Sequence, residues 1–418
     1  MIAVISGGSY KFHMTPLAAE LNQRGILGGY ITAGWPSGWQ KWIAQRFPKS
    51  GGWQRFLDRY EPIADALVHS QPAVEILLKI GDVLIRKISQ RAQQHLHRLA
   101  FHIYSTDCID VLSTVRPTIY HFRNCYGMKS VLHAKQVGAI TLCDHSIAHP
   151  VCLSWMESNR GAWPKSIQFD EIRRKMLPLY RQMEADLLHT DHVLVNSDFV
   201  KNTCVYMGML PKQIHVVYQG LDEAFFQFVK KFESSKKRSP ESLLFAGGWQ
   251  RRKGVDDLSK ALLALNQPWS LDIAGGFEQE TLSFPQMAEF LNNSHVNRMG
   301  ILPRVKLAEL MSQHRIFIFP SYCEGSARVI FEAMAAGCYV ITTNNSGSIV
   351  QDGVHGRVVP VGDVNALTSA IAEAINNPTW VDEVGAFNKH TIAQEYRQQD
   401  YANRVISVYR EITPQSIE

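Results

Sequence analysis

Hydrophobic residues along this 418-residue chain come in short runs, separated by longer stretches with the apolar spacing of amphipathic helices. Five runs lie in the first half and five in the second, at residues 2–6, 28–32, 118–122, 139–143, 192–196, 243–248, 270–276, 296–300, 315–320 and 339–343. Short strands that alternate with helices are typical of βαβ units, which build parallel sheets. The pattern therefore predicts an α/β protein with two consecutive Rossmann-like, doubly wound domains.

The two series of strands are separated by a charged, serine-rich stretch, VKKFESSKKRSPES, which has one proline and no apolar period. This composition is typical of a linker. The sequence predicts a first domain over residues 1–222, a linker over 223–240 and a second domain over 241–395. A helical pattern in the remaining residues, 396–418, is expected to pack back onto the first domain. The carboxyl ends of both sheets would then face one central cleft, where such folds bind ligands.

The segment EGSARVIFE holds two carboxylates, Glu324 and Glu332, eight residues apart. The first follows an apolar run that ends in Pro320, so it should lie in a turn between a strand and a helix. If the helix begins near Ser326, Glu332 lies about two turns inside it among apolar neighbours, where a carboxylate needs partners. The spacing suggests that the two side chains hold separate ends of an elongated polar ligand.

A basic cluster follows the first strand of the second series, in the segment FAGGWQRRKGVDDLSKAL. Arg251, Arg252 and Lys253 would stand near the start of a helix, where free amides and the helix dipole favour phosphate. The spacing differs from that of a Walker loop. Taken alone, the three cations are more typical of a solvated turn than of a phosphate site.

Together these residues resemble a known family. The E-x7-E pair, with AMAAGCYVITTNNSGSIVQDGVHGRVVPVGD after it, resembles the GT4-type retaining glycosyltransferases of the GT-B fold, over essentially the whole second domain. The resemblance implies that Glu324 contacts the donor sugar and acts in catalysis, while Glu332 contacts the ribose of the nucleotide. It also implies that Lys253, followed by Gly254, contacts the diphosphate.

The donor loop departs from the family in two places. The family often has Gly-Arg after the first strand, whereas this chain has Gly247-Gly248, so Arg251 or Arg252 would have to replace the missing arginine. We include Gly248 and Arg252 in the expected donor site. The common Glu-Gly-Phe-Gly is replaced by Glu-Gly-Ser-Ala, which leaves the identity of the sugar and nucleobase open. Its small residues, whose backbone would hold the diphosphate, are Gly325, Ser326 and Ala327.

The first domain resembles the family more loosely. Its ISGGSY turn, with Gly7 and Gly8, is similar to the family's glycine-rich loop on the acceptor side of the cleft. In TLCDHSIAHP, His145 falls where many relatives carry an active-site histidine. The nearby His121 and His149 are expected to be structural.

The resemblance implies transfer of a sugar from a nucleotide-diphosphate donor, UDP- or GDP-linked, to a sugar or lipid-linked acceptor. It implies retention of anomeric configuration and no need for a metal ion or another cofactor. Two enzymatic alternatives that share the fold are a sugar phosphorylase and a nucleotide-sugar epimerase. The alternative from another class is a non-catalytic subunit that binds sugar nucleotides, which the missing arginine would explain.

Composition bears on the use of the cysteines, the location of the protein and the charge of its partner. Seven cysteines, an odd number without a C-x-x-C pair, indicate neither a disulfide framework nor a zinc site. No apolar run is long enough to span a membrane, and the first residues lack the features of a signal peptide, so a cytoplasmic protein is expected. The first hundred residues carry 12 Lys/Arg against 6 Asp/Glu, which indicates an anionic partner. No nucleic-acid-binding motif accompanies this excess, so nucleic acid is not expected.

Residues 33–60 combine aromatic and cationic side chains and have two interpretations. In the first, the aromatics line the core or an acceptor pocket. In the second, the segment seats the protein peripherally on the inner face of an anionic membrane, because Trp favours the headgroup region and Lys/Arg bind anionic lipids. The residues concerned are Trp35, Trp39, Trp42, Phe47, Trp53 and Phe56, with Lys41, Arg46, Lys49, Arg55 and Arg59.

Overall fold

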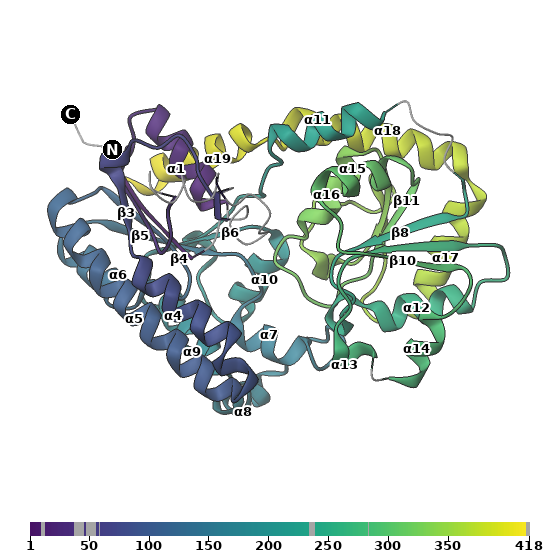
Figure 1. Cartoon of the computed structure of the whole chain (residues 1–418), viewed down its shortest axis with the longest axis horizontal. Helices are drawn as coiled ribbons and strands as arrows, with labels where there is room; N and C mark the ends of the chain where they lie inside the picture. Colours follow the sequence, from purple (N-terminus) through teal and green to yellow (C-terminus); the bar gives the residue numbers. More distant parts are fainter. Residues whose placement is uncertain are drawn as a thin grey trace.

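The structure is a computed structural model that describes residues 1–9, 13–36, 46, 56–57, 59–233, 239–282 and 284–414, without the side chains of residues 86, 90, 279 and 280. The described residues form two halves, each built around its own parallel sheet with helices on both faces (Figure 1). Among these residues, no helix combines the length and apolar character needed to cross a membrane.

The first sheet has seven parallel strands in the order β3-β2-β1-β4-β5-β6-β7. Their bounds are β1 Ala3–Gly8, β2 Leu27–Thr32, β3 Val68–Ser70, β4 Ile119–Arg123, β5 Ile140–His145, β6 His192–Val195 and β7 Ile214–Val216. The helices of this half are α1 Met14–Gln23, α4 Pro72–Val83, α5 Gln90–Val115, α6 Met128–Gln136, α7 Pro150–Met156, α8 Phe169–Lys175, α9 Pro178–His189 and α10 Asp198–Tyr206. Because both faces of the sheet are covered, its central strands are mostly apolar and do not alternate strictly with polar residues.

The second sheet has six parallel strands in the order β10-β9-β8-β11-β12-β13. Their bounds are β8 Ser242–Ala246, β9 Ser270–Ala274, β10 Val296–Gly300, β11 Ile316–Phe319, β12 Tyr339–Thr342 and β13 Gly356–Val358. The helices that follow in sequence are α11 Glu223–Phe232, α12 Val255–Leu263, α13 Gln279–Leu282, α14 Pro285–Leu291, α15 Arg304–Ser312, α16 Arg328–Ala335, α17 Val364–Asn376, α18 Pro378–Glu395 and α19 Gln398–Ile412.

The prediction of two parallel α/β sheets is confirmed. All ten apolar runs are strands, within a residue or two at their ends. Three strands, β3, β7 and β13, were not predicted. Each is only three residues long, which is too short for an apolar period to stand out from the surrounding sequence.

Helix α11 occupies the first half of the segment that the sequence predicts as a linker. Its Phe225 and Val229 are buried in the core of the second half, where α11 packs against α15. Because charged residues surround Phe225 and Val229, the overall composition of the stretch does not reveal this apolar face. The exact boundaries of the four predicted regions stay a prediction.

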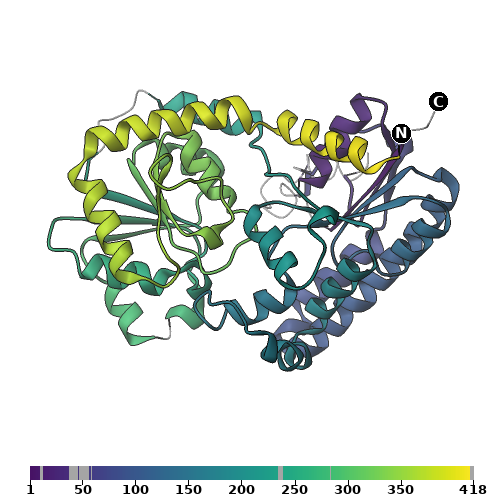
Figure 2. The same ribbon diagram turned by 180° about the vertical axis from the view of Figure 1, so that it is seen from behind.

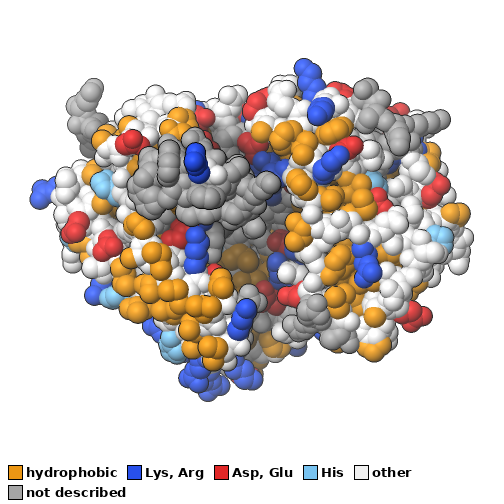
Figure 3. Space-filling view, viewed as in Figure 1, with side chains coloured by type: hydrophobic (Ala, Val, Ile, Leu, Met, Phe, Trp, Pro, Cys, Tyr) orange, Lys and Arg blue, Asp and Glu red, His pale blue; other side chains and the backbone are white. Residues whose placement is uncertain are grey.

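The two halves are joined twice, because the chain returns to the first half at its end. Helix α18 packs against α16, and α19 then packs against α1 on the first sheet (Figure 2). The return lies beside the outgoing connection: the Leu221 amide donates to the Tyr396 carbonyl at 2.8 Å, and the Gln398 amide donates to the Leu221 carbonyl at 2.9 Å. A Cβ on Gly220 would lie 2.1 Å from the Arg397 carbonyl oxygen, so glycine permits this close approach. Between the halves the surface is hollowed (Figure 3).

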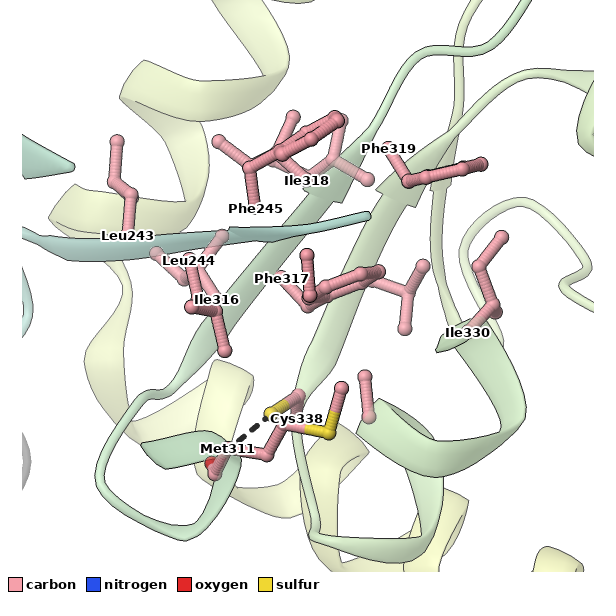
Figure 4. Packing of buried hydrophobic residues seen from close by; sticks show 14 of the residues in the cluster. Leu243, Leu244, Phe245, Met311, Ile316, Phe317, Ile318, Phe319, Ile330 and Cys338 are labelled. Atoms are coloured by element: carbon pink, nitrogen blue, oxygen red, sulfur yellow. Dashed lines mark hydrogen bonds between the residues drawn. The ribbon is translucent and has the colours of Figure 1, made fainter. Parts of the chain in front are cut away.

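Aromatic side chains form the centre of the second core (Figure 4). Phe245 of β8 stacks on Phe319 of β11 with ring centres 5.6 Å apart, and Phe317 lies 6.2 Å from Phe319. All three are fully buried. In the same core, Cys338, directly before β12, donates its S–H to the carbonyl of Met311 in α15 at 3.3 Å. Close packing of this kind fixes the end of β11, from which the loop with Glu324 departs.

Candidate functional site

The strand order reverses at one point in each sheet, between β1 and β4 and between β8 and β11. In open parallel sheets, ligands bind outside the carboxyl ends of the strands at such points. Gly7 and Gly8 end β1 in the first sheet, and Gly247 and Gly248 directly follow β8 in the second. Both predicted glycine loops therefore lie where the topology favours ligand binding.

The loops that carry His145 and Glu324 touch each other across the two halves. A Cβ on Gly325 would lie 1.8 Å from the carbonyl oxygen of Ser146, so only glycine fits at this point of contact. From the first half, the Ser197 hydroxyl donates to the Gly325 carbonyl at 2.5 Å. The structure thus brings the two predicted catalytic residues to opposite sides of one interface.

Two cations surround Glu324 on the donor side. Arg252 Nη1 lies 2.9 Å from Glu324 Oε1, but its hydrogen bond goes to the Cys323 carbonyl at 2.6 Å, so the contact with the carboxylate is electrostatic. Lys253 Nζ lies 3.8 Å from the same carboxylate oxygen. Burial lowers the pKa of Lys253, although Glu324 opposes this effect. The cluster places two positive charges and one negative charge at the end of the sheet.

Glycines allow this cluster to form. Gly254 has φ of 71°, and a Cβ there would lie 1.9 Å from the Pro320 carbonyl oxygen, so the turn after Lys253 fits against the end of β11 only with glycine. Gly247 has φ of 132°, and its Cβ would lie 2.9 Å from Lys253 Nζ. Gly248, the residue expected in the donor site, is under weaker constraint: its Cβ would first meet a side chain at 3.3 Å.

The two arginines proposed to replace the family's missing one have different surroundings. Arg251 pairs with Asp256 at 2.8 Å and lies over the ring of Phe284, 4.7 Å from its centre. Arg252 instead joins Glu324, and its Nε lies 3.8 Å from Glu157 of the first half. Arg252 is therefore the better placed of the two, as expected for the donor site.

The helix after Glu324 begins later than the sequence suggests. We expected it to begin near Ser326, but α16 begins at Arg328 and Ala327 is its N-cap. The Ala327 amide donates to the Ser346 carbonyl at 3.1 Å, so a diphosphate would have to displace that partner to use this amide. Glu332 consequently lies about one turn inside the helix, not two. The predicted start was wrong because the three small residues Gly325, Ser326 and Ala327 belong to the loop and not to the helix.

Glu332 is buried, and its carboxylate lies between two arginines. Its Oε1 is 3.4 Å from Arg304 Nη2 and 3.4 Å from Arg328 Nε. Both guanidinium groups also bind Asp222 Oδ2, at 2.8 and 2.7 Å. Burial raises the pKa of Glu332, while the two arginines work against that shift. The carboxylate itself is buried, but the two arginines reach the solvent, since their side chains are 43% and 47% exposed.

On the acceptor side, His145 is the last residue of β5 and is fully buried. Asn124 Nδ2 lies 2.8 Å from His145 Nδ1; with the amide donating, the ring proton is on Nε2. Burial lowers the pKa of His145 to about 4, so the imidazole is neutral near pH 7. Its Nε2 has no hydrogen bond of normal geometry among the described residues.

A cavity of about 390 Å³ opens beside His145. Its lining is mixed in character. The polar and charged lining residues include Ser9, Asp82, Arg123, Asn124 and Asp144, and the apolar ones include Leu78, Phe101, Tyr126, Ile147, Leu179 and Met183. A volume of this size and a wall of mixed character are typical of a small-molecule site.

The predicted glycine loop of the first half borders this cavity. Gly8 has φ of 70°, and a Cβ there would lie 2.5 Å from the ring of Tyr126. Its amide donates to the Tyr104 hydroxyl at 3.1 Å. Ser9 Oγ then lies 2.5 Å from the Tyr126 hydroxyl oxygen. Gly8 thus sets the position of Ser9 on the cavity wall.

Comparison with known proteins agrees with this geometry. The sequence model of the family "Glycosyl transferases group 1" matches residues 227–399, which contain the donor cluster and Glu332. The matched residues make up less than half of the chain and are similar to the glycosyl transferases group 1. The match covers α11 to the start of α19 and does not extend to the half that carries His145.

Relatives and solved structures extend the comparison. The alpha-maltose-1-phosphate synthase of Mycolicibacterium smegmatis is 25% identical over 233 residues, which are 50% of this chain and 59% of that protein. The chain spans little more than half the length of such curated relatives. Anabaena HepE in complex with UDP superposes with a TM-score of 0.63 at 12% identity, over 99% and 100% of the two chains. Sucrose-phosphate synthase from Thermosynechococcus elongatus gives 0.61 at 18%, over 98% of both. The architecture is GT-B, as the sequence predicts.

The sequence did not predict several residues that contact Arg252 and Glu332. Arg328 precedes Glu332 by four residues, so helical spacing would have paired them. No sequence signal connects Arg304 or Asp222 to Glu332, because they come from other elements. Glu157, which faces Arg252 from the first half, was also missed; burial raises its pKa.

A buried polar network that was not predicted borders the cavity through Asp144. Asp144 Oδ2 is 2.7 Å from His13 Nε2 and 3.8 Å from His121 Nε2, and His121 Nδ1 is 2.7 Å from the Tyr409 hydroxyl of α19. Burial opposes ionisation of Asp144, but the two histidines outweigh it and hold its pKa well below the usual range. His121 thus makes its contacts inside the fold. His149 does so as well: it caps α7 by accepting from the Val151 amide at 3.3 Å.

The aromatic and cationic stretch 33–60 is described only at its ends and at Arg46. Trp35 is 7% exposed and packs on Tyr30 in the first core. Arg59 is buried and pairs with Glu75 at 2.6 Å. These end residues belong to the fold of the first half. The residues on which the two interpretations mainly depend lie outside the described residues: Trp39, Lys41, Trp42, Phe47, Lys49, Trp53 and Arg55.

Proposed function

We propose that the protein is a retaining glycosyltransferase that moves a sugar from a nucleotide-diphosphate donor to an acceptor, without a metal ion. The observation that carries the proposal is the contact between two loops across the cleft. On one side, the loop after β11 presents Glu324 next to Arg252 and Lys253 of the turn after β8, and on the other side His145 ends β5 beside a cavity. A donor on one side and an acceptor on the other would meet at this contact.

The donor side fits a nucleoside diphosphate sugar, UDP- or GDP-linked. Lys253 and Arg252 bind the diphosphate, and Glu324 accepts hydrogen bonds from sugar hydroxyls. Glu332, held by Arg304 and Arg328, accepts from the ribose. The presence of UDP in the HepE structure, which shares the fold, supports this choice of donor class.

Bond breaking in the donor builds negative charge on the leaving diphosphate. Lys253 could stabilise this charge. Burial lowers its pKa in the free protein, and a dianion bound beside it would raise that pKa and favour the charged ammonium. Arg252 adds a second fixed charge. Positive charge aimed at the leaving group lowers the barrier in the way that oxyanion holes do, so the protein itself supplies what a metal would supply elsewhere.

His145 serves in positioning within this proposal. With a pKa of about 4 it is a weak base near pH 7, so a large contribution to proton abstraction is not expected. Its neutral ring donates from Nε2 to a hydroxyl of the donor sugar or the acceptor. The cavity beside it is lined by both polar and apolar side chains, which suits a sugar acceptor carried on a lipid. Such an acceptor places a cytoplasmic protein at the inner face of a membrane.

The test is turnover of purified protein with a panel of UDP- and GDP-sugars. Release of nucleotide that depends on an acceptor, with the donor's anomeric configuration in the product by NMR, supports the proposal. The same rate after treatment with a chelator supports metal independence. A sugar phosphate formed with inorganic phosphate would identify a phosphorylase, and an epimerised sugar would identify an epimerase. Donor binding without turnover would identify a non-catalytic subunit.

A further inference from the structure

Helix α4 carries apolar side chains on two opposite faces. Val74 and Leu78 point into the first core and are at most 4% exposed. On the outer side Ile76, Ile80, Val83 and Leu84 repeat with helical spacing, and their exposed fractions are 57%, 37%, 57% and 57%. In the segment that follows, Ile88 is 82% exposed. A helix that is apolar on both faces is normally covered on both.

This outer stripe forms a patch on the surface. Figure 3 shows hydrophobic side chains gathered over the lower left of the first half, where Figure 1 places α4. Contiguous apolar patches of this kind on soluble proteins mark interaction sites. Below the patch, at the end of the molecule near α8, Lys and Arg side chains gather (Figure 3).

Cations line a groove along α5, the helix that packs against α4. The groove lies between α5 and the turn from α8 to α9 and has a volume of about 710 Å³. Arg91, Arg98, Lys175 and Arg181 line it, and no Asp or Glu is among its lining residues. Nearby in sequence, residues 76–99 hold five Lys/Arg against one Asp, and residues 173–181 hold four Lys/Arg and no acid. The nearest acid on α8, Glu171, pairs with Lys175 at 2.6 Å.

We propose that this surface docks the protein on an anionic lipid bilayer. We call it the α4 face: the outer stripe of α4, Ile88 and the four cations of the groove. The apolar side chains enter the boundary between headgroups and acyl chains, and the arginines and lysine bind lipid phosphates. Charge complementarity selects a membrane surface over a second copy of this chain, since the same cations would face each other in a symmetric pair.

The α4 face lies directly behind the acceptor cavity. Leu78 on the inner side of α4 lines the cavity, as does Asp82 one turn later. Docking through the outer side of the same helix would bring the cavity wall close to the headgroups. A lipid-linked acceptor could then reach His145 while its tail stays in the bilayer. This last step rests on the proposed function, whereas the docking itself does not.

The experiment is co-sedimentation of the full chain with vesicles of phosphatidylcholine, with and without phosphatidylglycerol. We expect binding to the anionic vesicles at low salt and its loss as salt rises. Replacing Arg91, Arg98 and Arg181 together by Gln should weaken binding about a hundredfold, since each cation near the surface adds about 1 kcal/mol. Replacing Ile76, Ile80 and Leu84 together by Gln should weaken it about tenfold or more.

Matched control variants carry the same chemical changes elsewhere. Lys129, Lys212 and Lys260 to Gln remove three exposed cations, and Leu210, Leu263 and Ile301 to Gln remove three exposed apolar side chains. Both controls should bind vesicles like the wild type, and circular dichroism should show all four variants folded. Equal losses in control and α4-face variants would overturn the proposal, because binding would then follow overall charge or hydrophobicity.

Two further outcomes would also overturn it. One is that the wild type ignores anionic vesicles even at low salt. The other is self-association in sedimentation velocity that the Ile76, Ile80 and Leu84 replacements abolish, without any vesicle binding. Turnover of a water-soluble acceptor, measured in the same variants, separates the two proposals: docking can fail while transfer persists, and transfer can fail while docking persists.

Discussion

The carboxyl edges of the two sheets meet at one contact but differ in the charges of the side chains that they present. On the second sheet, the partly exposed cations Lys253 and Arg252 lie around Glu324, next to glycines and stacked phenylalanines. On the first sheet, His145 is neutral and fully buried beside a cavity. A site that receives a dianion needs fixed positive charge. The cavity on the first sheet instead combines Arg123, Asp82 and Asp144, which carry both signs of charge, with apolar side chains. The difference supports donor binding on one side and acceptor binding on the other.

The largest effect is expected on the charged side. Lys253→Ala and Glu324→Ala should each lower the transfer rate at least tenfold without changing the melting temperature. Each removes a charge-assisted contact worth about 1.5 to 3 kcal/mol. The measurement is initial rate in the turnover assay. Lys260→Ala, in the last turn of α12, is the matched control and should behave like the wild type. Normal turnover in either site variant would remove the donor assignment.

The neutral side predicts a pH dependence of stability. The folded pKa of His145, about 4, lies below the ordinary value of about 6.5, so the unfolded chain takes up a proton first as pH falls. Stability should therefore decline as pH falls from about 6.5 towards 4. In His145→Gln the decline between about pH 7 and pH 5 should be smaller, by about 2 kcal/mol at most.

Urea unfolding at several pH values measures this decline. His189→Gln, a change at an exposed histidine on α9, provides the comparison and should leave the profile unaltered. An identical pH profile for His145→Gln and the wild type would mean that His145 is not held neutral by burial. The contrast between the two edges would then lose its basis.

Glu332 sharpens the comparison, because its arginine partners also hold Asp222. Glu332→Gln should weaken donor binding about tenfold if Glu332 accepts from the ribose, with little change in melting temperature. Asp222→Asn removes the other carboxylate on Arg304 and Arg328 and should leave donor binding nearly intact. Calorimetric titration and melting curves measure both. Lower melting temperatures in both variants, with unchanged donor affinity, would give Glu332 a structural role only.

The smallest effect is expected where the two halves are tied together. Arg160 of the first half pairs with Asp257 of α12, and its side chain is 49% exposed. Such a contact contributes about 1 kcal/mol or less. Arg160→Ala should lower the melting temperature slightly and raise the donor KM less than threefold (about 0.6 kcal/mol). A double-mutant cycle with Asp257→Asn isolates the pair; a coupling energy of zero would show that other contacts hold the halves together.

The sequence by itself determined the two parallel sheets and the positions of the donor cluster. Buried parallel strands are apolar throughout, so their runs are visible without any contact information. Lys253, Glu324 and Glu332 were predicted as site residues because they follow such strands and because their spacing resembles that of a known family. The three shortest strands, the burial of α11 and the start of α16 were missed, because each depends on packing against distant elements.

Only the tertiary structure decided which residues complete the site. Asp222, Arg304 and Glu332 come from separate elements, and the contact of Ser146 with Gly325 joins residues 179 positions apart. The sequence also could not choose between Arg251 and Arg252, since adjacent residues differ only in direction, which the turn at Gly254 sets. Local periodicity reports which face of an element is apolar, whereas the pairing of charges across a cleft follows from how the two sheets are placed against each other.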